Sequence, residues 1–123
     1  MIRKLVFVFL LVVSSFGLFG QDSEAAKMVG ELFQIQFDSP QEAIELGNKI
    51  LNTPKVTDFE QSYALIGIGT SYSIQGKTSK AVPYLLKAID VAEKTTNYEL
   101  RVNSNLALAN VYTKMNLHEQ SYA

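Results

Sequence analysis

The chain has 123 residues, a length that suits one compact domain or a short array of repeats. It carries 11 basic and 12 acidic side chains, one histidine and no cysteine. This composition excludes disulfides, thiolate metal sites and histidine clusters, and it gives no basic face for nucleic acid. We therefore expect no metal, no cofactor and no nucleic-acid partner for this segment.

The first twenty residues differ in character from the rest. Two cations, Arg3 and Lys4, are followed by about sixteen mostly apolar residues that end at Gly20. This layout is typical of a secretory signal peptide, and the run is shorter than the roughly 20 residues of a bilayer-spanning helix. Cleavage is expected after Gly17 or after Gly20, and an uncleaved membrane anchor is the alternative. Residues 1–20 thus predict export to the periplasmic or extracellular side, with membrane contact only through this segment or through a part downstream.

Beyond this segment, apolar residues recur at helical spacing, and no stretch alternates for long as a strand would. The pattern predicts helices over residues 23–37, 40–52, 58–75, 79–95 and 97–115, and a sixth from 118 onward. Further starts are expected at Asp22 or Ser23 and at Thr78 or Ser79. Three starts pair a capping side chain with a glutamate three residues later, the signature of a capping box: Ser39 with Glu42, Thr57 with Glu60, and Thr96 with Glu99.

The helices repeat with an internal period of about 38–40 residues. Gly69 stands three residues before Tyr72, and forty residues later Ala109 stands three residues before Tyr112. Ala43 likewise precedes Ala81 by 38 residues. Each unit is a helix, a tight turn and a second, antiparallel helix.

The middle unit, ALIGIGTSYSIQGKTSKAVPYLLKAIDVAEK (residues 64–94), resembles the tetratricopeptide repeat family in its longer-period form. The resemblance implies an all-α fold in which helix-turn-helix repeats stack as a right-handed α-solenoid. It divides the chain into a signal segment (1–20), a divergent first repeat or cap (21–57), the best-matching repeat (58–97) and a truncated third repeat (98–123). The residues that carry the pattern are Gly69, Tyr72, Gly76, Ala81, Leu85, Ala88, Ala109, Tyr112 and Ser121.

The outer units match the pattern less well. In the first, Glu31 stands at the small position, Gln34 at the aromatic position and Gly47 at a large position. In the third, Asn116 replaces the turn glycine, and Ser121 replaces an alanine of a second helix that begins near residue 118. Because that second helix is cut short, we expect part of the third unit to lack a packing partner, at Leu108, Val111 and Tyr112.

The tripeptide Gly76-Lys77-Thr78 looks like the tail of a phosphate-binding loop. Such a loop needs a glycine five residues before Gly76, and that position is Ser71. It also needs a strand leading into the loop, whereas the preceding residues have helical spacing. We therefore expect Gly76 to end a helix, with no nucleotide bound and no enzymatic activity.

The resemblance also implies a binding surface, because the first helix of each unit lines a concave groove for peptides or partner proteins. Asn103 and Asn110 lie two helical turns apart and can bond a peptide backbone as donors and acceptors. The groove lacks the lysine and arginine set of the chaperone-binding members. We expect an exported, non-enzymatic interaction scaffold that is part of a larger protein; the alternative is the sensor segment of a membrane-anchored histidine kinase or helix-turn-helix regulator. The expected groove residues are Tyr63, Ile66, Thr70, Ser73, Asn103, Leu106, Asn110 and Thr113.

Overall fold

The part of the chain described here is entirely helical. The computed structural model describes residues 23–122, and it describes the side chains of residues 23–117. The helices are α2 (Glu24–Ile35), α3 (Pro40–Leu51), α4 (Asp58–Ile74), α5 (Thr78–Glu93) and α6 (Tyr98–Tyr122). This confirms the all-α class, while the expected signal segment and its cleavage sites lie outside the described residues. None of the described helices has the length and hydropathy needed to cross a bilayer.

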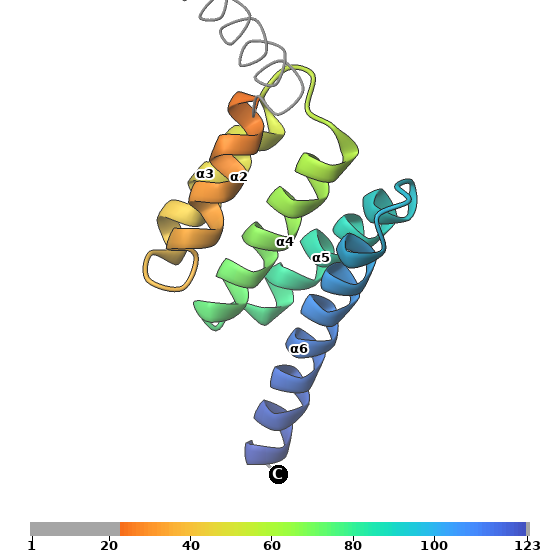
Figure 1. Ribbon diagram of the computed structural model, residues 1–123. Coiled ribbons are helices and arrows are strands. Elements are labelled where there is room, and N and C mark those ends of the chain that lie inside the picture. Colours follow the sequence, from red (N-terminus) through yellow and green to blue (C-terminus); the bar gives the residue numbers. More distant parts are fainter. Residues whose placement is uncertain (1–22, 123) are drawn as a thin grey trace, which may run out of the picture.

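The helices form a row in which the chain reverses direction at every connection (Figure 1). Each helix packs against the next one along the chain, and α4 also contacts α2 and α6. Helix α4 therefore touches all four of the other described helices. The C-terminal end of α6 projects beyond the rest of the row (Figure 1).

Two of the helix starts follow directly from their capping residues. The Ser23 Oγ accepts a hydrogen bond of 3.1 Å from the Ala26 amide at the start of α2. At α4 the Glu60 amide donates to Thr57 Oγ1 at 3.1 Å, and the Thr57 amide donates back to Glu60 Oε1 at 3.2 Å. This reciprocal pair satisfies two amides that the helix itself leaves without partners, and it confirms the capping box predicted there.

The other predicted caps differ from the structure. Ser39 makes no side-chain capping bond, and α3 instead begins with Pro40, whose missing N–H and fixed φ suit the first helical turn. Helix α5 begins at Thr78, one of the two starts expected there, and the residue before it, Lys77, makes no side-chain capping bond. The cap of α6 is Asn97 rather than Thr96, because Asn97 Oδ1 accepts from the Leu100 amide at 2.9 Å.

Gly76 ends α4 as expected, with a φ of 80°. Its amide donates to the Ser73 carbonyl at 3.0 Å, and the next amide, that of Lys77, donates to the Tyr72 carbonyl at 2.8 Å. These two bonds form a Schellman motif, which requires the left-handed conformation that glycine adopts without strain. Both amides are therefore engaged by helix carbonyls rather than directed outward to cradle a phosphate.

Small residues allow close approach between the helices of the middle unit. A Cβ placed on Gly69 would lie 2.6 Å from Leu85 Cδ2 and 3.3 Å from the Ala81 carbonyl oxygen, both on α5. Ala81, Leu85 and Ala88 are fully buried. Helices α4 and α5 therefore approach closely where Gly69 meets Ala81 and Leu85.

The first unit uses small residues in a different way. Glu31 and Gln34, which stand at the small and aromatic positions of the repeat, are both exposed. Gly47 of α3 instead receives the side chain of Ile68 from α4, and Gly67 of α4 receives Leu32 from α2. The divergent positions are thus compensated by packing onto α4.

The turn predicted at Asn116 is wrong, because α6 continues through it to Tyr122. In the left-handed conformation the Cβ of Asn116 would crowd the backbone, whereas Gly76 has no Cβ. Asn116 therefore favours continuation of the helix over a turn. Ser121 lies near the end of α6 instead of in a second helix. Val111 is buried and Leu108 packs on the cluster formed by Ala81 and Leu85, so the expectation of an uncovered surface holds only for Tyr112.

Candidate functional site

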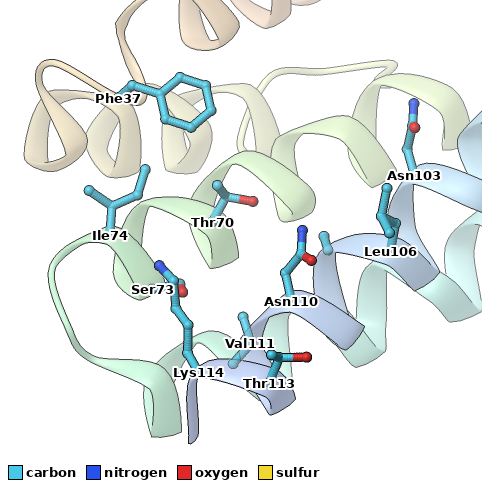
Figure 2. A pocket seen from close by; sticks show the side chains of 11 residues that line it. Phe37, Thr70, Ser73, Ile74, Asn103, Leu106, Asn110, Val111, Thr113 and Lys114 are labelled. Carbon is cyan, nitrogen blue, oxygen red and sulfur yellow. The ribbon is translucent and has the colours of Figure 1, made fainter. Parts of the chain in front are cut away.

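A groove with a cavity volume of about 460 Å³ lies between the α2–α3 turn, the C-terminal half of α4, and α6 (Figure 2). Phe37 stands on the side opposite the α6 residues, with α4 between them (Figure 2). The groove therefore spans all three helical units. It is lined by Phe37, Thr70, Ser73, Ile74, Asn103, Leu106, Ala107, Asn110, Val111, Thr113 and Lys114.

Helical periodicity brings the α6 residues to one side of the groove. Asn103, Leu106, Asn110 and Thr113 are spaced three, four and three residues apart, which keeps them on a single helix face. Figure 2 shows these side chains one after another along α6. Because α6 is packed against both α4 and α5, this stripe is presented on a fixed element rather than on a loop.

The lining combines an apolar floor with separate polar groups. The apolar part comes from Ile74, Leu106 and the ring of Phe37, which is 67% exposed. The amide of Asn103 approaches the Tyr63 hydroxyl at 3.5 Å, a long contact for a hydrogen bond. The Lys114 ammonium is the charged group among the lining side chains.

The polar atoms differ in what they can offer to a ligand. Thr113 Oγ1 donates to the Ala109 carbonyl at 2.9 Å, so its hydroxyl oxygen can only accept. Each asparagine amide provides two donors and one acceptor oxygen. A ligand with alternating N–H and C=O groups, such as a peptide backbone, matches this set.

Six of the eight groove residues expected from the sequence line the cavity. These are Thr70, Ser73, Asn103, Leu106, Asn110 and Thr113. Tyr63 lies beside it, with its ring centroid 5.2 Å from that of Phe33 and 4.7 Å from that of Phe59, and it reaches the groove only through its contact with Asn103. Ile66 is only 6% exposed and belongs to the core with Leu65 and Ala88, so it is not available to a ligand.

The sequence reasoning missed five lining residues. Ile74 and Lys114 each follow an expected residue, Thr70 and Asn110, by one helical turn, so helical spacing could have included them. Ala107 follows Asn103 in the same way. Val111 was expected to be uncovered but not to line the groove. Phe37 belongs to the α2–α3 turn, and no repeat position in the chain predicts that it lines the groove.

Among the described residues, no group of three histidine, aspartate or glutamate side chains is placed to hold a metal ion. Comparison of the chain with protein-family models, with curated protein sequences and with solved structures gave no match.

Proposed function

We propose that the groove between the α2–α3 turn, α4 and α6 binds an extended segment of a peptide or partner protein. The proposal rests on one observation. Asn103 and Asn110 both stand on the wall of a 460 Å³ groove that has an apolar floor. Concave, mostly apolar sites with a few placed polar groups are the usual form of a binding pocket.

The spacing of the two asparagines fits an extended backbone. Seven residues of α-helix advance about 10.5 Å, at roughly 1.5 Å per residue. An extended chain covers that distance in about three residues, at roughly 3.3 Å per residue. Asn103 and Asn110 would thus bond backbone groups three residues apart, while the side chains between them enter the apolar floor beside Leu106 and Phe37.

The proposal includes membership of the tetratricopeptide repeat class, in which helix-turn-helix pairs stack as an α-solenoid. Two contacts support it: the packing of α4 against both α2 and α6, and the close approach of Gly69 on α4 to Ala81 on α5. The apolar segment at residues 1–20 supports an exported scaffold, which fractionation of the expressed chain tests. That segment equally suits the sensor part of a membrane-anchored regulator whose active domain lies downstream.

The binding proposal is tested with peptides selected from a random library on the full chain. Replacing Asn103 and Asn110 together by alanine should weaken binding of a selected peptide by about fivefold or more, because hydrogen bonds of this kind contribute about 0.5–1.5 kcal/mol each. Isothermal titration calorimetry measures the change. The matched control is Asn105→Ala, an exposed asparagine on the same helix that does not line the groove.

Two results would contradict the proposal. One is the failure of any peptide to bind the chain with a dissociation constant below about 1 mM, near −4 kcal/mol. The other is equal loss of affinity in the Asn105 control and in the double variant, which would place the peptide elsewhere.

A further inference from the structure

The two asparagines of the groove differ in their surroundings. Asn110 is exposed, whereas Asn103 is half-buried and its Nδ2 donates to the Tyr63 hydroxyl at 3.5 Å. Asn105 differs from both, because its Nδ2 donates to the Arg101 carbonyl of its own helix at 2.8 Å. The amide of Asn103 is therefore linked to a side chain of α4.

The ring of Tyr63 is fixed by two aromatic neighbours. Its centroid lies 5.2 Å from that of Phe33 on α2, with an angle of 85° between the ring planes, and 4.7 Å from that of Phe59, with an angle of 67°. Both pairs are edge-to-face, an arrangement that aromatic rings favour. The same ring packs against the buried cluster that contains Leu32 and the one that contains Leu65. The fold thus sets the position of the Tyr63 hydroxyl before any ligand is present.

The contact between Tyr63 and Asn103 adds little to the packing of the helices. Close approach within the middle unit comes from Gly69 and Ala81, which lie elsewhere. At 3.5 Å the contact is long for a hydrogen bond, so its contribution to stability is small. Its main effect is to restrict the orientation of one amide on the wall of the groove.

We infer that Tyr63 is a positioning residue, whose hydroxyl orients the Asn103 amide so that Asn103 Oδ1 accepts a backbone N–H of the ligand. The inference rests on the peptide-binding function proposed above. The amide group is planar, so a nitrogen directed at Tyr63 leaves the oxygen on the other arm of the group, where it can accept.

This arrangement has two consequences for the ligand. A side chain that is already oriented loses less conformational entropy on binding, so Asn103 contributes more to affinity than the exposed Asn110 does. The ligand residue that meets Asn103 must also supply an N–H, which excludes proline at that position because its nitrogen carries no hydrogen.

The first test needs no ligand. In the ¹⁵N-labelled full chain, the side-chain amide of Asn103 should show a higher heteronuclear nuclear Overhauser effect than that of Asn110, because it is more ordered. Tyr63→Phe keeps the ring and removes the hydroxyl, so it should lower the Asn103 value to that of Asn110. Asn105, whose amide is bonded within α6, is the internal reference and should not change.

The second test is a double-mutant cycle on the binding of a selected peptide, measured by isothermal titration calorimetry. Tyr63→Phe should weaken binding by about threefold or more in the parent chain, and by less than about 1.5-fold when Asn103 is already alanine. The matched control is Tyr84→Phe, since the Tyr84 ring lies beside Tyr72 and does not line the groove. This control should bind as the parent does.

A third comparison tests the accepted N–H directly. Methylation of the peptide nitrogens one at a time should reveal one position at which affinity falls about fivefold in the parent and hardly changes in Asn103→Ala. Circular dichroism checks that each variant folds. Asn103→Ala should also lose more affinity than Asn110→Ala, a comparison that leaves Tyr63 in place and does not depend on the folding of Tyr63→Phe.

The outcomes separate this inference from the function on which it rests. Equal losses from Tyr63→Phe with and without the Asn103 amide would overturn the inference alone, because Tyr63 would then act through its ring. An Asn103 amide as mobile as that of Asn110 in the parent chain would also overturn it. Failure of any peptide to bind would overturn the proposed function and this inference with it.

Discussion

At the scale of single residues, glycine and alanine determine how closely the helices approach. Gly69 leaves room for Leu85, Gly47 for Ile68 and Gly67 for Leu32, so a large side chain of one helix enters a gap in its neighbour. Close packing makes such contacts sensitive to volume, because a densely packed interior has few voids that can absorb added atoms. The small residues of the sequence pattern therefore indicate how closely neighbouring helices pack, and they do not indicate a chemical activity.

This sensitivity gives a stability prediction for Ala81. The side chain is fully buried against α4, and leucine would add three carbon atoms beside Gly69. Overpacking of this kind costs about 1–3 kcal/mol of the free energy of unfolding. Urea denaturation of Ala81→Leu followed by circular dichroism should show that loss, whereas Ser79→Leu on the exposed side of α5 should stay within about 0.5 kcal/mol of the parent. A parent-like midpoint for Ala81→Leu would mean that α4 and α5 are not in the register described.

At the scale of helices, the sequence predicted the interiors well and several of the ends poorly. Apolar spacing located α2, α3 and α5 because one face of each is buried, whereas α4 is buried on most sides. Gly76 was predictable because a Schellman turn requires a left-handed residue, and glycine is the residue that adopts this conformation most easily. Asn116 was not, because asparagine is found both in left-handed turns, at a steric cost, and within helices, so its identity alone does not distinguish the two.

The residues that line the candidate groove could likewise be predicted only in part from the sequence. Its α6 wall could be predicted because Asn103, Leu106 and Asn110 follow from helical spacing. Ile66 was misplaced because a helix that touches four neighbours buries more of its circumference than a surface helix does, so α4 has no wide solvent-facing side. Phe37 was missed because its position depends on the path of a turn, for which the repeat pattern gives no rule.

The helix caps give a test at this scale, since two similar starts differ in structure. Thr57 accepts from the Glu60 amide, whereas Ser39 makes no side-chain capping bond. Thr57→Ala should lower the free energy of unfolding by about 0.5–2 kcal/mol, and Ser39→Ala should change it by much less. Thermal unfolding followed by circular dichroism measures both. Equal losses in the two variants would show that the capping box of α4 contributes nothing specific.

At the scale of the whole molecule, α4 holds the described helices together. It packs against α2, α3, α5 and α6, whereas α2 and α3 have no packed contact with α5 or α6. Each of these helices is stabilised by the helices packed against it, so the one with the most neighbours should open last. The C-terminal end of α6, by contrast, projects beyond the other helices (Figure 1).

Native-state hydrogen exchange should therefore be uneven along the chain. Amides in the middle of α4, around Leu65 to Ile68, are buried on several sides and should exchange only when the whole molecule unfolds. Amides beyond Asn116 belong to the C-terminal end of α6, which projects beyond the other helices (Figure 1), and fraying at such a helix end costs close to 0 kcal/mol. Mass spectrometry of peptic fragments, corrected for intrinsic rates, should show exchange in α4 at least about a hundredfold slower than at the end of α6, a difference of roughly 2.7 kcal/mol. Equal protection of the two segments would mean that α6 is held along its full length by contacts beyond those that α4 and α5 provide.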